Sequence, residues 1–134
     1  MTTKNKSFQP RWAEWEKLIV EAGISIDRPR NSIHPDRPEI RYPIDYGFVN
    51  GTLGTDGNEL DIFVGSEETG LVGAILTTDR IKKDRECKLL YNCSPEEVYL
   101  INGFINFDRE KMWGVLVMRV EMSVLWKKVL PADR

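Results

Sequence analysis

The stretch YPIDYGFVNGTLGTDGNELDIFVG, residues 42–65, decides the fold and raises a chemical question. Two apolar segments flank the pair Asp56-Gly57, which is typical of a β-hairpin turn. The stretch therefore predicts strands at 45–53 and 59–64, and Asp61 lies inside the second strand among apolar neighbours. Because an ionised carboxylate is costly to remove from water, a bound ligand would explain this position.

The composition limits what that ligand is. The chain has 134 residues, of which 41% are hydrophobic, and this suits one globular domain with one core. Lys and Arg number 19 against 21 for Asp and Glu, so the net charge of -2 gives no basic field that would attract nucleic acid or an anionic membrane. We expect a single domain over 1–134, with an N-terminal helix region at 1–23 and a barrel with a helix over 24–134.

The sequence carries no signal for a membrane or for secretion. No apolar run approaches the roughly 18 residues that a membrane span needs, and the first residues, MTTKNKSF, lack the apolar core of a signal peptide. The expected location is the cytoplasm, where Cys87 and Cys93 would be free thiols. Since His34 is the single histidine, zinc donors are scarce and any metal would be a hard cation held by carboxylates.

The pattern outside the quoted stretch predicts an α+β domain that is mainly β. Residues 10–23 begin with proline, carry apolar side chains at helical spacing and end at glycine, so they predict an amphipathic helix. Ser94 and Glu97 form a capping-box pattern that opens a helix through about Asn106. Further strands are expected at 24–27, 71–79, 87–93 and 113–122, and the proline-containing segment 28–41 is expected to be a structured loop. About five strands and two helices suit a small barrel-like domain.

Each acidic candidate has a structural interpretation beside the functional one. Asp56 before glycine is often a turn residue, and the alternative for Asp61 is an edge strand. Asp79 ends a predicted strand, and Asp84 and Glu86 follow it in a basic segment that by itself is typical of solvated surface. Convergence of these carboxylates favours Mg²⁺, with phosphate bound by the nearby cations. Those cations are Lys82, Lys83 and Lys88 near one set of acids, and Arg28, Arg30, Arg37 and Arg41 elsewhere.

Residues 42–61 resemble, without a gap, the central segment of the soluble family I inorganic pyrophosphatases. In that family a Tyr-Pro-x-x-Tyr-Gly-aromatic strand runs into Asp-x-Asp-(Pro or Glu)-apolar-Asp. The segments ISIDRPRNS, VGAILTTD and CKLL resemble further strands of the family, so the resemblance covers roughly 24–90. It implies a closed five-stranded β-barrel of the oligonucleotide-binding type, with an N-terminal and a C-terminal helix packed outside.

The resemblance also implies roles for individual residues. Tyr46 matches the tyrosine that orients the nucleophilic water, and Lys88 matches the phosphate-binding lysine. Asp84 keeps the family's spacing from Asp79, whereas Glu86 stands two residues before the lysine, and both remain candidate ligands. The implied metal ligands are therefore Asp27, Asp56, Asp61, Asp79, Asp84 and Glu86.

Several departures from the family pattern change what the site is expected to do. Asn58 replaces the carboxylate that takes a proton from the attacking water, and an amide cannot be that base. The family's hairpin with a Lys-x-Glu pair and an Arg is replaced by the short HPDRPEIR, residues 34–41, and its late Tyr-Lys pair has no match near 107–108. His34 and Arg37 are candidates to replace the missing phosphate clamp, although such loop residues are often simply surface residues. With Arg28, Arg30 and Lys88 they form the predicted substrate-binding set.

Two classes of function remain. The first is hydrolysis of inorganic pyrophosphate or a related phosphoanhydride by water activated by Mg²⁺ or Mn²⁺. The alternative is a catalytically impaired relative that binds metal and a phosphorylated ligand; a barrel that binds single-stranded nucleic acid would need a basic aromatic groove. Loss of a general base removes about 10² to 10⁴ in rate, and metal lowers the pKa of water to about 7 without that base, so hydrolysis is favoured. The expected partners are a small phosphate-containing substrate and, in a homo-oligomer, further copies of the chain, with neither nucleic acid nor membrane.

Overall fold

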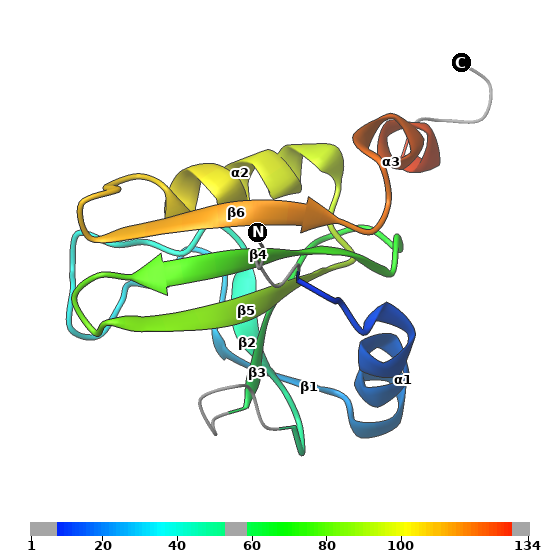
Figure 1. Ribbon diagram of the computed structural model, residues 1–134, viewed down its shortest axis with the longest axis horizontal. Coiled ribbons are helices and arrows are strands. Elements are labelled where there is room, and N and C mark those ends of the chain that lie inside the picture. The colour runs from blue at the N-terminus through cyan, green and yellow to red at the C-terminus, as the bar shows by residue number, and fades with distance from the viewer. Residues whose placement is uncertain (1–7, 53–58, 130–134) are drawn as a thin grey trace, which may run out of the picture.

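The computed structural model describes residues 8–52 and 59–129. Within these ranges the chain forms one mixed sheet and three helices, which confirms the prediction of a mainly β protein with helices (Figure 1). The elements in chain order are α1 (Trp12–Ala22), β1 (Ile24–Arg28), β2 (Asp45–Val49), β3 (Leu60–Val64), β4 (Leu71–Asp79), β5 (Asp84–Tyr91), α2 (Pro95–Ile105), β6 (Met112–Met118) and α3 (Met122–Val129).

The sheet has six strands in the order β1-β2-β3-β5-β4-β6. Its neighbours are antiparallel except for the parallel pair of β3 and β5. The predicted closed five-stranded barrel is therefore wrong, because β1 and β6 lie at opposite edges and no pairing joins them within the described ranges. Apolar alternation decides which side of a strand faces a core, whereas closure depends on the tilt and stagger of the whole sheet. Moreover β1 is only five residues long, and Pro29, which follows it, has no N–H to extend the pairing.

The two faces of the sheet carry separate apolar cores. Leu60 and Ile62 pack on one face with Ile19 of α1. Phe63 packs on the other face with Ile101 of α2, and Figure 1 shows α2 lying along β6 while α1 lies near the opposite side of the sheet. This alternation places Asp61 on the α2 face. Since β3 lies between β2 and β5, the edge-strand alternative for Asp61 is wrong.

The first two helices begin and end within two residues of their predicted limits. α1 ends at Gly23, whose φ of 81° is in the left-handed region that glycine tolerates. α2 begins with a capping box in which Ser94 Oγ accepts from the Glu97 N–H at 3.2 Å and Glu97 Oε1 accepts from the Ser94 N–H at 2.9 Å. Both predicted thiols, Cys87 and Cys93, are free. None of the helices in the described ranges is long and apolar enough to cross a membrane.

The second half of the chain differs from the prediction in two places. The predicted strand 113–122 is too long, because β6 ends at Met118 and the third helix, α3, follows. Leu125 of α3 is completely buried in the core beneath α2, so tertiary burial favours a helix here. In addition, β5 begins at Asp84 rather than at Cys87, because Asp84 pairs with Asp79 across a β4–β5 hairpin.

The other boundaries agree more closely. β2 and β3 pair in antiparallel register, as the predicted hairpin requires. β2 ends at Val49, before the predicted limit at 53, and the predicted turn at Asp56-Gly57 lies outside the described residues. The segment between β1 and β2 is a loop with an isolated bridge between Ile33 and Arg41, as expected from its prolines.

Glu16 connects α1 to the sheet at the start of β4 and just after the end of β6. Its Oε1 accepts from Arg119 Nη1 at 2.8 Å, and its Oε2 accepts from the Leu71 N–H at 3.2 Å. The hydrogen bond from Arg119 is the main reason that the pKa of Glu16 is lowered, and the Leu71 N–H lowers it further while burial opposes them. A carboxyl group whose pKa is lowered by folding stabilises the native state only while it is ionised.

We expect Glu16→Gln to lower the free energy of unfolding at pH 7 by about 0.5 kcal/mol, because the pair is partly exposed and screened by solvent. The loss should shrink as the pH falls through the folded pKa of Glu16, below its ordinary value of 4.5. Urea unfolding of both proteins at pH 7 and at low pH measures this. Glu14→Gln, on an exposed position of the same helix, is the control, and an equal loss in the control would contradict the role of Glu16.

Candidate active site

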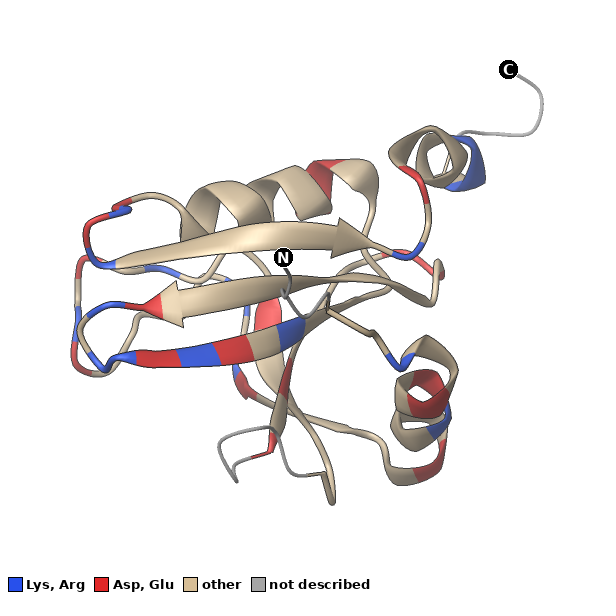
Figure 2. Ribbon diagram, in the orientation of Figure 1, with Lys and Arg blue, Asp and Glu red and all other residues tan. Residues whose placement is uncertain are grey.

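Four polar side chains from β2, β3 and β5 meet on the α2 face of the sheet. We call Tyr46, Asp61, Glu86 and Lys88 the Lys88 cluster. The parallel pairing of β3 with β5 places Asp61 opposite Lys88, and Glu86 lies on the same face two residues earlier. Figure 2 shows charges of both signs alternating along β5, which is where the cluster's acid and lysine lie.

The ammonium group of Lys88 is the centre of the cluster. Its Nζ donates to Tyr46 Oη at 2.8 Å, to Asp61 Oδ2 at 2.9 Å and to Glu86 Oε1 at 2.6 Å. Tyr46 Oη in turn donates to Asp61 Oδ2 at 2.9 Å. A lysine ammonium has three hydrogens, so these three acceptors use all of them.

The cluster is buried around its lysine and open at its acids. The Lys88 side chain is 7% exposed, whereas those of Asp61 and Glu86 are 25% and 26% exposed. Burial alone would lower the pKa of Lys88, but the oxygens of Tyr46, Asp61 and Glu86 more than offset it and raise the pKa. The lysine is therefore charged at neutral pH. Burial also raises the pKa of Tyr46, which keeps the phenol neutral.

Negative charge is in excess in this cluster. Two carboxylates face one ammonium group, and burial is the main reason that the pKa of Glu86 is raised. Lys88 opposes this shift, while the carboxylates of Asp61 and Asp84 add to it. Carboxylates that repel one another in a half-buried site attract a cation.

Asp79 and Asp84 extend this acidic surface toward the end of the β4–β5 hairpin. They lie directly opposite each other in the register, where like charges destabilise a sheet. Asp79 also has the ordinary turn role, since its Oδ1 accepts from the N–H groups of Ile81 and Lys82 at 2.9 Å each. Neither residue has a hydrogen bond to the Lys88 cluster, although the charge of Asp84 acts on Glu86.

The chemistry of these donors fits a hard divalent cation. They are all oxygens, which Mg²⁺ and Mn²⁺ prefer, and the surplus negative charge would favour binding. In the described part of the chain, however, no three His, Cys, Asp or Glu side chains are close enough to hold a metal ion. The predicted residues Asp56 and Asn58 lie outside the described residues, so the candidate ligands that the structure describes at the cluster are Asp61 and Glu86.

A stack of aromatic rings joins the cluster to the loop that precedes β2. Tyr46 stacks on Tyr42 with ring centroids 5.4 Å apart, and Tyr42 stacks on His34 at 6.3 Å. The guanidinium of Arg28 lies 5.9 Å from the centre of the Tyr42 ring. Its Nε is buried and has no hydrogen-bond partner among the described residues. Arg28 is thus a positive group, close to the cluster, that has unused hydrogen-bonding capacity.

The remaining predicted residues lie apart from the cluster. Arg37 pairs with Glu39 at 2.7 Å within its own loop. Asp27 is exposed on β1. Its charge acts on Tyr42, whose pKa is raised mainly by burial and to a lesser extent by Asp27 and Asp61. His34 Nδ1 accepts from the Asp36 N–H at 3.1 Å within the same loop.

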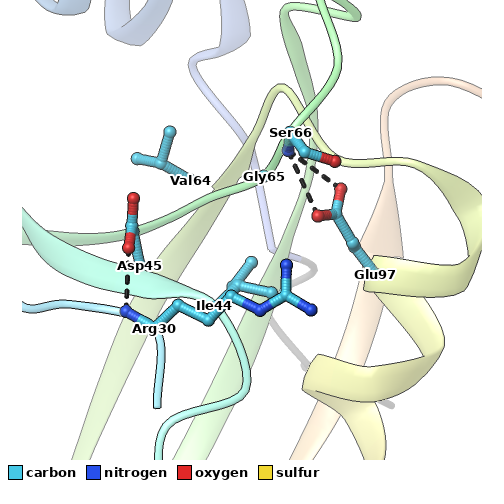
Figure 3. Close-up of a pocket in the computed structure, with 7 residues that line it drawn as sticks. All are labelled: Arg30, Ile44, Asp45, Val64, Gly65, Ser66 and Glu97. Atoms are coloured by element: carbon cyan, nitrogen blue, oxygen red, sulfur yellow. Dashed lines mark hydrogen bonds between the residues drawn. The ribbon is translucent and has the colours of Figure 1, made fainter. Parts of the chain in front are cut away.

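Arg30 lines a separate pocket of about 140 Å³ at the end of β3 (Figure 3). Its backbone N–H donates to Asp45 Oδ1 at 2.8 Å, and Figure 3 shows its guanidinium extending toward the side where Glu97 lies. The Glu97 carboxylate is occupied by the Ser66 N–H at 3.1 Å and by its own helix cap. The pocket is smaller than the roughly 300 Å³ at which pockets for drug-sized ligands begin.

Sequence reasoning missed the structural role of Tyr42 and the extent of β5. Tyr42 is 7% exposed and is stacked directly on Tyr46; its place in the same Tyr-Pro-x-x-Tyr segment was the available signal. The spacing of two residues between the charged side chains of Asp84, Glu86 and Lys88 was the signal that they belong to one face of a strand. Interpreting this segment as a loop left the choice between Asp84 and Glu86 open, and the structure brings Glu86 to Lys88.

Comparison with known proteins points to one family. A family model described as inorganic pyrophosphatase matches residues 22–81. The inorganic pyrophosphatase of Mycoplasma genitalium is 28% identical in an alignment 137 positions long, gaps included, that covers 86% of this chain and 74% of that protein. The inorganic pyrophosphatase of Mycoplasma pneumoniae is 26% identical in an alignment 125 positions long that covers 75% of this chain and 68% of that protein.

A solved structure shows a similar fold. The structure of an inorganic pyrophosphatase from Coxiella burnetii matches with a TM-score of 0.50 and 17% identity, covering 78% of this chain and 88% of that one. The matched family segment contains Tyr46 and Asp61 and ends just after Asp79. Glu86 and Lys88, which complete the cluster, follow this segment.

We expect Tyr46→Phe to destabilise the protein by about 1 to 3 kcal/mol, because it removes a partner from a buried ammonium and from a carboxylate. Urea unfolding measures the loss, and Tyr99→Phe on the exposed face of α2 is the matched control. A loss in Tyr46→Phe no larger than that in the control would show that the hydroxyl contributes nothing to the cluster.

Proposed function

We propose that this chain, which is a divergent relative of the soluble inorganic pyrophosphatases, hydrolyses inorganic pyrophosphate and needs Mg²⁺ or Mn²⁺ to do so. The Lys88 cluster carries the proposal. It combines Tyr46 and Asp61, from the segment that matches the family, with an acid and a lysine from β5. The pyrophosphatase names of the Mycoplasma relatives support the same substrate.

Asp61 and Glu86 would hold the cation, with Asp84, Asp79, Asp27 and Asp56 as further proposed ligands. When bound, a divalent cation supplies a water of lowered pKa and polarises the phosphoryl oxygens. Tyr46 is neutral because burial raises its pKa, and its proton is donated to Asp61 Oδ2, so its hydroxyl oxygen would orient the attacking water by accepting a hydrogen bond from it. The rings of Phe63 and Phe104, packed near Tyr46 and Tyr42, exclude bulk water from this side.

Positive groups would neutralise the phosphate that leaves. Arg28 is the best placed of the predicted arginines, because its buried Nε has no partner among the described residues and it lies over Tyr42. A guanidinium binds phosphate through paired N–H donors. Lys88 is close enough to contribute, but its three hydrogens must first leave their present acceptors. The other predicted cations are weaker candidates. His34 lies in the loop before β2, Arg30 lines the separate pocket, and Arg37 is paired with Glu39.

The alternative is a relative that binds metal and a phosphorylated ligand without useful turnover. Asn58 favours it, because the residue expected to act as general base is an amide. The two functions differ in what pyrophosphate does after it binds, so phosphate release decides between them.

A cytoplasmic location and a homo-oligomer remain predictions. Apolar side chains on the outer face of α2 support an interface between copies, since Tyr99 is 59%, Leu100 51% and the nearby Phe107 90% exposed. Apolar surface of this kind is common where proteins associate.

We expect phosphate release from pyrophosphate in the presence of Mg²⁺ and none when a chelator is added. Asp61→Asn should reduce this rate by about 10²-fold or more, because it removes a charge at the centre of the site. Glu121→Gln, on an exposed position before α3, is the control. Calorimetry that shows metal and pyrophosphate binding without phosphate release would favour the alternative function.

Replacing Asn58 by an acid tests whether the carboxylate missing from the family pattern limits the rate. We expect Asn58→Asp to raise the rate at neutral pH about tenfold, near the low end of what a positioned base contributes. It should also tighten metal binding, because a negative charge is added. A fall in activity would show that the Asn58 amide serves the reaction in another way and that the family's base should not be assigned here.

A further inference from the structure

Lys88 presents a problem for any site that binds a divalent cation. Its ammonium is already a cation, and it lies 2.9 Å from Asp61 Oδ2 and 2.6 Å from Glu86 Oε1. These are the two carboxylates of the cluster that would bind metal. Two cations that use the same carboxylates repel each other strongly at such short range.

Lys88 is equally unsuited, in this arrangement, to bind a phosphate. Tyr46, Asp61 and Glu86 together accept all three of its hydrogens. The side chain is also only 7% exposed, so an anion outside the cluster meets the two acids before it meets the ammonium. A lysine that binds phosphate needs at least one free donor.

From these contacts we propose that Lys88 is an internal counter-cation. It holds Asp61 and Glu86 together in the metal-free protein, and a divalent cation displaces it from them. The inference rests on the proposed metal requirement. Once displaced, the Lys88 ammonium would have hydrogens to donate to a phosphate oxygen.

The side chain of Lys88 is able to make this movement. Lysine carries its charge on a flexible stem of four carbons with three rotatable donors, so Nζ can leave the carboxylates while the backbone stays in the β3–β5 pairing. Tyr46 is retained as a partner of Asp61 after the exchange, because its own hydrogen bond to Oδ2 does not involve the lysine.

The test compares metal binding by the wild-type chain and by Lys88→Met, which keeps the length of the side chain and removes its charge. Without the ammonium, Asp61 and Glu86 repel each other, so the variant should melt at a lower temperature in chelator. Mg²⁺ or Mn²⁺ should raise its melting temperature more than that of the wild type, and calorimetry should show a metal dissociation constant lower by about tenfold or more. Lys17→Met, on an exposed position of α1, controls for the loss of one positive charge.

The outcomes separate this inference from the proposed function. Tighter metal binding by Lys88→Met supports the counter-cation, even if the wild type releases no phosphate from pyrophosphate and the proposed function fails. Metal binding that is unchanged or weaker in Lys88→Met overturns the counter-cation, even if the wild type is an active pyrophosphatase. The same tightening in Lys17→Met would also overturn it, since the effect would then be one of overall charge.

If Lys88→Met does not fold, the wild-type chain provides the measurement. The ammonium protons of a buried, fully hydrogen-bonded lysine exchange slowly, and a ¹H–¹⁵N spectrum of lysine Nζ groups should show this signal in chelator. Saturating Mg²⁺ should shift the signal or remove it by faster exchange with water. A signal that stays unchanged when metal is bound would show that Lys88 keeps its place and would overturn the inference.

Discussion

The burial of the Lys88 ammonium group constrains how three strands of the sheet are paired. With 7% of its side chain exposed, Lys88 cannot rely on water, and a buried charge without partners costs several kcal/mol or more. Its acceptors come from β2, β3 and β5 itself. These strands must therefore be neighbours in the register observed, because a slip of one residue would turn Asp61 or Lys88 to the opposite face.

The apolar residues of the same strands explain why this polar cluster is tolerated. Leu60 and Ile62 are buried against α1, and Phe63 is buried against α2. Strand β3 is thus packed on both of its faces. On the α2 face, Phe63 belongs to the core, whereas Asp61 contacts the charged Lys88. Rings of Tyr42 and Tyr46 mark that boundary. Both rings pack as apolar groups, and the Tyr46 ring also carries its hydroxyl into the Lys88 cluster.

Local pattern was sufficient for part of this arrangement and insufficient for the rest. Period-two alternation predicted that Asp61 and Phe63 share a face, and capping residues predicted the start of α2, because both signals lie within a few residues. The parallel pairing of Asp61 with Lys88 joins residues 27 positions apart, and no local pattern encodes it. Only the resemblance to a family suggested that these two belong to one site.

The errors have the same origin. Interpreting the basic segment around Asp84 and Glu86 as solvated surface followed its composition, whereas pairing with β4 makes both residues part of a strand. Closure of a barrel was inferred from the family and depends on the geometry of every strand at once. The helix α3 is stabilised by the burial of Leu125 under α2, an interaction that the isolated segment does not contain.

The charge of the cluster connects its architecture to its chemistry. Asp61 and Glu86 carry two negative charges, and the Lys88 ammonium neutralises one of them. In this state the cluster offers a divalent cation only one net negative charge, together with direct repulsion from the lysine. In the proposed exchange, movement of the ammonium off the carboxylates would double the negative charge that the cation meets and would free ammonium hydrogens for a phosphate oxygen. The sequence also has an amide, Asn58, where the resemblance to the family predicts an acid, so the chain offers one carboxylate fewer to a cation and the charge of Lys88 weighs more in the balance.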